Sequence, residues 1–173
     1  MGHRMRVLKR TVGLGAASLA ACLVAVAPPS GAESPPFFGS IGGTLQVTGV
    51  GPNGPTSAVY SGTGTATQLG SARMEGEISI VGPAPCPNGF TATHNDTLTA
   101  SDGSRLSMAI SETSCPRPAD PSTYDCTGTY TITGGTGRFT SATGSGNWAG
   151  SVAFAPDGSA TFSTSYSGTL PRP

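Results

Sequence analysis

One histidine and two carboxylates fall on adjacent segments of this 173-residue chain, with a spacing that suits acid–base chemistry. His94 and Asp96 lie two residues apart, so in a β-strand they share the apolar face of segment 90–100. Glu112 has the same parity as Ile110 on the following segment. Titratable groups on an apolar face are costly unless they are paired, solvated or placed in a pocket, where they can serve as general acids and bases. His94, Asp96 and Glu112 are therefore our candidate catalytic residues; the alternative is that they only form structural hydrogen bonds.

The connection between these two segments predicts how they pair. Asp102-Gly103 lies between two alternating runs, which is typical of a tight β-hairpin. With Asp102 and Gly103 as a two-residue turn, His94 is expected opposite Ser111, and Glu112 diagonally beside His94.

A period-two alternation of apolar and polar residues continues along most of the chain after residue 41 and predicts β-strands. Turns rich in Gly, Pro, Asn and Asp separate the segments, and none shows a convincing helical period. Strands are expected near residues 42–50, 56–68, 72–81, 89–100, 105–115, 126–133, 146–155 and 159–169. This even spacing predicts an all-β domain over residues 42–170, an eight-stranded antiparallel up-and-down β-barrel.

Aromatic side chains supply much of the expected interior. The candidates for the core, or for the wall of a ligand cavity, are Tyr130, Trp148, Phe154, Phe162 and Tyr166. The interior of an eight-stranded barrel is either just filled by side chains or holds one small ligand.

The first 32 residues have the order of a secretory signal peptide. Basic residues in 1–10 precede an uncharged run at 11–27, and small residues at 30–32 suit cleavage after Ala32. The expected product is a secreted, extracellular protein with short tails at 33–41 and 171–173. The alternative is a lipobox at Leu19-Ala20-Ala21-Cys22, in which a lipidated Cys22 would anchor the protein to a membrane.

The charge of the exported chain limits its partners. Without residues 1–32 the chain keeps five Arg, no Lys and nine acidic residues, a net charge of −4. That balance argues against nucleic acid and anionic membranes as partners. One histidine and few free thiols do not make a typical zinc site, so we expect no metal and no cofactor. The remaining partner class is a small apolar ligand.

Three cysteines follow residue 32, and an exported protein is permitted disulfides. Cys115 and Cys126 flank a ten-residue loop at 116–125, and a hairpin there would bring them face to face. We therefore predict a Cys115–Cys126 disulfide, with Cys86 as the rival partner for either. A structural role is favoured over a nucleophilic one because no neighbouring base or cation would hold a thiolate.

The most specific motif is Gly134-Gly135-Thr136-Gly137-Arg138-Phe139, followed by Ala142 and Gly144. Its glycines permit a sharp turn, with Phe139 plugging the barrel end while Arg138 stays solvated. The motif resembles an element of the allene oxide cyclase–dirigent barrel superfamily, especially of its exported bacterial members. The resemblance spans about residues 42–170 and implies an eight-stranded antiparallel barrel that is often a homotrimer. The family's acidic catalytic residues lie outside the matched element, so the resemblance transfers no activity.

Two functional hypotheses follow. The first is a non-enzymatic exported barrel that binds a small apolar molecule or acts as a surface module. The alternative is a cofactor-free isomerase or cyclase that uses His94 with Glu112 or Asp96. The shape of the interior distinguishes them, because a solidly packed barrel favours a structural role and an open pocket beside His94 favours binding or catalysis.

Overall fold

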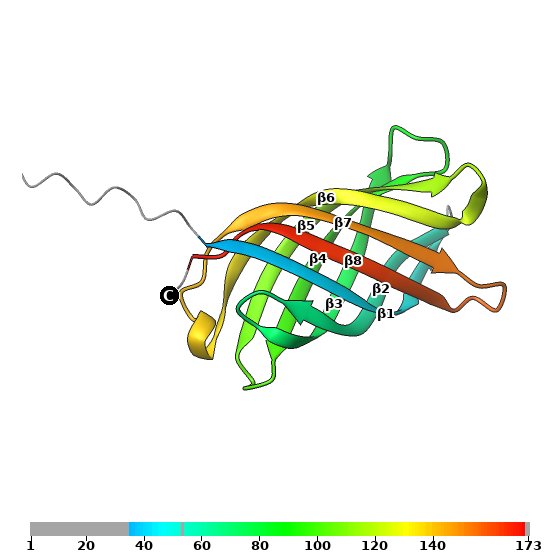
Figure 1. Cartoon of the computed structure of the whole chain (residues 1–173). Helices are drawn as coiled ribbons and strands as arrows, with labels where there is room; N and C mark the ends of the chain where they lie inside the picture. The colour runs from blue at the N-terminus through cyan, green and yellow to red at the C-terminus, as the bar shows by residue number, and fades with distance from the viewer. Residues whose placement is uncertain (1–34, 53, 172–173) are drawn as a thin grey trace, which may run out of the picture. The chain divides into compact units, whose positions relative to one another are not determined.

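Inward and outward side chains alternate along the long strands of the computed structural model, which describes residues 35–52 and 54–171 (Figure 1). The strands are β1 (Pro36–Gly51), β2 (Gly54–Ala66), β3 (Gly70–Pro83), β4 (Phe90–Ala100), β5 (Arg105–Arg117), β6 (Asp120–Thr136), β7 (Ser145–Phe154) and β8 (Ala160–Thr169). Each strand pairs with the next in antiparallel fashion, and β8 pairs with β1 to close the sheet. The predicted eight-stranded antiparallel barrel is confirmed.

Two strands begin six residues earlier than the sequence predicts. β1 begins at Pro36, so the segment predicted as a tail over 33–41 is strand from that residue on. Phe37 and Ile41 turn inward there and are fully buried, but the exposed Phe38 and the small residues after it hide the alternation. β6 begins at Asp120, so most of the loop predicted at 116–125 is also strand. The predicted signal peptide lies outside the described residues.

One end of the barrel is closed by packed side chains. A single 3-10 turn, η1 (Gly137–Phe139), follows β6 and lies at the end where β1 starts and β8 ends (Figure 1). Phe139 is buried to 1% exposure together with Leu69 and Leu170, whereas the Arg138 side chain is 42% exposed. The predicted plug at this end is confirmed. In residues 35–52 and 54–171 no helix is long and apolar enough to cross a membrane.

The hairpin between β4 and β5 has a three-residue turn instead of the predicted two-residue turn. Ala100 and Ser104 pair across the turn, and Gly103 adopts a positive φ of 83°. Such three-residue turns end in a left-handed residue, a conformation that favours glycine. The pairing is therefore shifted by one residue, and His94 lies opposite Ile110 instead of Ser111.

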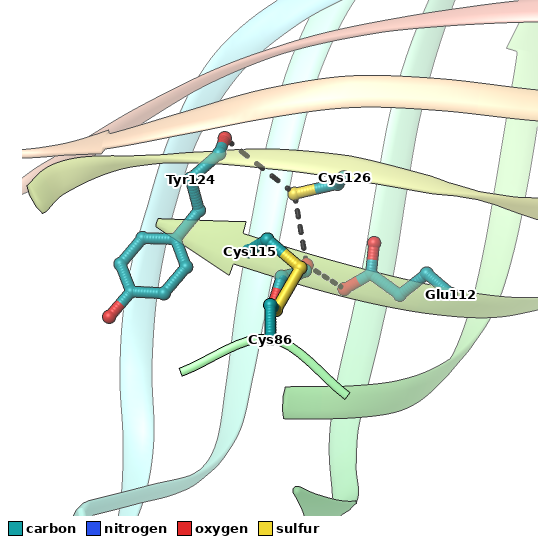
Figure 2. Close-up of a disulfide and its surroundings, with 6 residues drawn as sticks. Cys86, Glu112, Cys115, Tyr124 and Cys126 are labelled. Atoms are coloured by element: carbon teal, nitrogen blue, oxygen red, sulfur yellow. Dashed lines mark hydrogen bonds between the residues drawn. A yellow bond between two sulfur atoms is a disulfide. The ribbon is translucent and has the colours of Figure 1, made fainter. Parts of the chain in front are cut away.

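The disulfide lies at the opposite, open end and joins Cys86 to Cys115 (Figure 2). The predicted Cys115–Cys126 disulfide is wrong because the β5–β6 register pairs Cys126 with Ser114, not with Cys115. Cys126 therefore shares the inner face with Ser114, while Cys115 points to the outer face, as side chains alternate along a strand. Cys126 is a buried free thiol.

Candidate functional site

A pocket of about 930 Å³ opens at the end of the barrel that carries the disulfide. Its walls come from the inner faces of the strands and from the turns that connect them. The main apolar lining residues are Val47, Ala58, Ile78, Ile80, Phe90, Tyr124, Val152 and Phe154. The polar side chains of Glu112 and Ser114 also line it. Ligand sites in proteins commonly combine such an apolar wall with a few convergent polar groups.

A row of residues across three strands forms the interior below this pocket. Tyr60 on β2, Gly76 on β3 and Asp96 on β4 lie side by side in register. A methyl group at Gly76 would overlap the Tyr60 ring and lie 2.6 Å from Asp96 Oδ1. Because Gly76 has no side chain, Tyr60 can cross it and donate its hydroxyl proton to Asp96.

The Asp96 carboxylate accepts hydrogen bonds from two tyrosines. Its Oδ1 accepts from Tyr60, and its Oδ2 accepts from the Tyr166 hydroxyl at 3.0 Å. Burial raises the pKa of Asp96 above its ordinary value, while the bonds from Tyr60 and Tyr166 and the nearby His94 lower it in part. Burial, with the Asp96 charge, also raises the pKa of Tyr60 and of Tyr166 well above the usual range. Both phenols therefore remain proton donors.

His94 connects this row to Glu112. Its Nδ1 lies 2.9 Å from the Tyr60 hydroxyl, and its Nε2 lies 3.1 Å from Glu112 Oε1. The Tyr60 hydroxyl donates its hydrogen bond to Asp96, and the tautomer of His94 decides which group donates between Nδ1 and the Tyr60 oxygen. The contact between Nε2 and Glu112 Oε1 lacks the alignment of a full hydrogen bond.

Glu112 also accepts a hydrogen bond from Ser114, which lies toward the open end of the barrel. The Ser114 hydroxyl lies 3.1 Å from Glu112 Oε1 and 3.0 Å from the Cys126 sulfur (Figure 2). Burial, followed by the Glu112 charge, raises the pKa of Cys126 to about 12. Cys126 is therefore a protonated thiol at neutral pH.

A small cavity of about 30 Å³ lies between this network and the pocket. Its wall includes His94, Glu112, Trp148 and Phe162. Three buried polar atoms on its lining residues have no hydrogen-bond partner, namely His94 Nε2, Glu112 Oε2 and Trp148 Nε1. The Trp148 indole helps to lower the pKa of its cross-strand neighbour Tyr166, but its N–H makes no aligned hydrogen bond.

The structure brings His94, Asp96 and Glu112 together, as the parity argument predicted. The five predicted cavity aromatics lie in four different places. Phe154 lines the large pocket, and Trp148 and Phe162 line the small cavity. Tyr166 belongs to the hydrogen-bond network, and Tyr130 packs against Phe37 away from both cavities.

Sequence analysis missed Tyr60 and Ser114. Tyr60 follows Val59, and two large residues in succession obscure the alternation that would have marked Tyr60 as inward. Ser114 lies at an inward position of β5, but a serine there gives no distinctive signal.

Comparison with known proteins gives no further constraint. No protein-family model, curated protein or solved structure matches this chain. The resemblance to the allene oxide cyclase–dirigent superfamily therefore stays a prediction. In the part of the chain that the structure describes, no group of three or more His, Cys, Asp or Glu side chains could hold a metal ion.

Proposed function

We propose that this protein binds a small, largely apolar molecule in the pocket at the open end of its barrel. The observation that carries the proposal is the asymmetry of the interior. The end with Phe139 is closed, whereas the other end holds a pocket of about 930 Å³. That volume is within the usual range for small-molecule sites, and an apolar wall gains free energy when a ligand replaces water.

A hollow on the outer surface is a weaker candidate. It measures about 860 Å³ and is lined partly by Arg73, Glu75 and Glu77. Arg73 and Glu75 form an ion pair with each other, and both side chains are more than 60% exposed. A ligand bound there would stay in contact with water and would gain little from burial.

The binding proposal is tested with a neutral apolar dye, N-phenyl-1-naphthylamine, whose fluorescence rises on transfer from water. The variant Ala58→Phe places a ring in the pocket from a residue that is 6% exposed. We expect it to weaken dye binding at least about tenfold, because the ring occupies the space the dye needs.

The matched control is Ala153→Phe, an exposed position on the outer face of β7 near the same end. It should leave dye binding unchanged. Thermal unfolding followed by circular dichroism verifies that both variants fold. Equal dye binding by the wild type and folded Ala58→Phe would refute the proposed site, and so would failure of the wild type to bind.

A second candidate function is proton transfer on the bound molecule, as in a cofactor-free isomerase. The observation that favours it is the 3.1 Å contact between His94 Nε2 and Glu112 Oε1, because Glu112 also lines the pocket. NMR in D₂O tests it with 2-decanone, whose α-hydrogens exchange when an acid–base group acts on them. Exchange that is accelerated by the wild type and lost in His94→Gln would support catalysis. Equal exchange with and without protein would leave ligand binding as the only proposed function.

Export of this barrel remains part of the proposal. The basic, apolar and small-residue order of positions 1–32 supports secretion, and Cys22 offers a lipid anchor as the alternative. Intact-mass measurement of the exported protein distinguishes cleavage after Ala32 from a lipidated N-terminal Cys22. Native mass spectrometry of the same sample reports the oligomeric state and any ligand that stays bound.

A further inference from the structure

The large pocket and the small inner cavity share part of their lining. Leu45, Ile78, Glu112 and Val152 line both the large pocket and the small inner cavity, so they form the neck between the two. The inner cavity of about 30 Å³ has room for one water-sized group. A ligand in the pocket can therefore pass only a small terminal group through the neck.

The inner cavity has the polar atoms that such a group requires. Glu112 Oε2 is an acceptor without a partner, and Trp148 Nε1–H is a donor that makes no aligned hydrogen bond, although it lies near Tyr166. Both residues are 7% exposed and both line this cavity. Figure 2 shows a dashed line at only one oxygen of the Glu112 carboxylate, and that line is the hydrogen bond from the Ser114 hydroxyl. Buried polar atoms in proteins are rarely left without a partner, so this pair points to a ligand group that engages both.

We propose that the bound molecule is an apolar alcohol whose terminal hydroxyl enters the inner cavity. There the hydroxyl donates to Glu112 Oε2 and accepts from Trp148 Nε1–H. This inference rests on the proposed function, because it requires that the rest of the molecule occupies the apolar pocket. It adds the chemical class of the ligand and the two residues that select it.

The other common polar groups satisfy this site less well. An ammonium group donates but cannot accept, so it leaves the Trp148 N–H unpaired. A carboxylate accepts only, and it would meet the Glu112 carboxylate in a medium of low dielectric constant. An ether oxygen accepts a hydrogen bond from Trp148 but has no hydrogen to donate to Glu112. A hydroxyl is both donor and acceptor, and its size matches the cavity.

The experiment compares four probes of similar length, namely 1-decanol, 1-methoxynonane, decanoate and decylammonium. Each competes with N-phenyl-1-naphthylamine for the pocket at pH 7. We expect the wild type to bind 1-decanol at least about tenfold more tightly than 1-methoxynonane, because the ether leaves a buried acceptor unpaired. Decanoate should bind more weakly than the ether.

Two variants assign this preference to the residues. Trp148→Phe keeps an aromatic ring but removes the N–H, and Glu112→Gln removes the charge at constant size. Each should reduce the ratio of alcohol to ether affinity to about threefold or less while the dye still binds. Glu77→Gln, an exposed carboxamide substitution on the outer face of β3, is the matched control and should keep the wild-type ratio. Circular dichroism verifies folding, and the wild-type comparison of the four probes remains decisive if a variant fails to fold.

The outcomes distinguish the hydroxyl site from the proposed binding function. If the dye binds but the alcohol and the ether compete equally, the hydroxyl site is refuted while the binding function stands. Preference for decylammonium would also refute the hydroxyl site, in favour of ion pairing. If neither the dye nor any probe binds to the wild type, the proposed function itself fails.

Discussion

At the scale of single residues, Asp96 is the most unusual ionisable group of the barrel interior. Residue Asp96 is 1% exposed, yet its carboxylate accepts hydrogen bonds from two tyrosine hydroxyls. Those bonds favour the charged form, whereas burial disfavours it, and burial is the larger effect because the pKa rises. The tyrosines therefore reduce the cost of a buried charge without removing it.

This balance predicts a dependence of stability on pH. A carboxyl whose folded pKa lies above its unfolded value stabilises the fold most below that unfolded value, and the contribution falls as pH rises through the folded pKa. We therefore expect the unfolding free energy of Asp96→Asn, relative to wild type, to increase as pH rises from 3.5 to 7. Urea unfolding at several pH values measures it.

Asp157 offers a control of opposite sign. Hydrogen bonds from Ser159 lower the pKa of this exposed carboxyl, so its stabilising effect is present at neutral pH and is lost as pH falls. The unfolding free energy of Asp157→Asn, relative to wild type, should therefore rise as the solution becomes more acidic. The same slope for both variants would contradict the assignment of a raised pKa to Asp96.

Gly76 permits the network by its lack of a side chain. A Cβ at this position would collide with Tyr60 and Asp96, so Gly76→Ala forces at least one of them to move. We expect a loss of about 1–3 kcal/mol in unfolding free energy, measured by urea denaturation. Gly82→Ala on the same strand is the control, because there the new methyl group would meet only Thr91 Oγ1 at 3.9 Å. A loss of similar size at Gly82 would mean that the cost lies in strand β3 and not in the contact with Tyr60.

At the scale of secondary-structure elements, the two ends of the barrel are secured by different means. The closed end depends on buried apolar side chains around η1. The open end depends on a covalent link between the β3–β4 connection and β5. The interior of the open end holds the pocket.

The plug at the closed end yields a prediction that separates packing from surface charge. Phe139→Ala should lower the unfolding free energy by about 3–5 kcal/mol, because it removes a fully buried ring. Arg138→Ala should cost about 1 kcal/mol or less, since its ion pair with Asp102 is largely solvated. Thermal and urea unfolding measure both. Similar losses for the two variants would contradict the plug.

The disulfide yields a prediction on covalent connectivity. Peptide mapping without reduction should recover Cys86 linked to Cys115, and Cys126 should react with iodoacetamide only after unfolding. Replacing Cys86 and Cys115 together by Ala should lower the unfolding free energy by about 2–4 kcal/mol, because the unfolded chain without the link has a higher conformational entropy. Cys126→Ala should keep the linked peptide. Recovery of a Cys115–Cys126 peptide would contradict the β5–β6 register.

At the scale of the whole barrel, the closed sheet leaves no unpaired edge among the eight strands. The interior is then divided along its length into a packed end, a polar network and an open pocket. The hydrogen-bond network crosses the barrel from Tyr166 on β8 through Asp96 to Glu112 on β5. A ligand in the pocket would therefore contact a floor whose network side chains come from β2, β4, β5 and β8.

Binding in the pocket should stabilise the entire fold. At a free ligand concentration one hundred times the dissociation constant, the unfolding free energy should rise by about 2.7 kcal/mol. Differential scanning calorimetry with increasing 1-decanol measures this as a rise in Tm. Ala58→Phe should lose the rise, and Ala153→Phe should keep it. A Tm that does not change in the wild type at saturating concentration would contradict binding to the native state.

The amino-acid sequence by itself determined the class of fold, the number of strands and the inward position of His94, Asp96 and Glu112. The physical reason is that side chains alternate along a strand, so a local pattern states which residues face the core. It also identified Phe139 as the plug, because a large apolar residue follows a glycine-rich turn.

Only the tertiary structure decided the pairing register, the disulfide and the position of Tyr60. Register depends on one residue more or less in a turn, as at Gly103, and one shift exchanges the partners of every residue along a hairpin. Whether two cysteines meet depends on that register and on the face each occupies. The division of the barrel into a packed end and an open pocket depends on how side chains from all eight strands fill one shared space, and no segment contains that information alone.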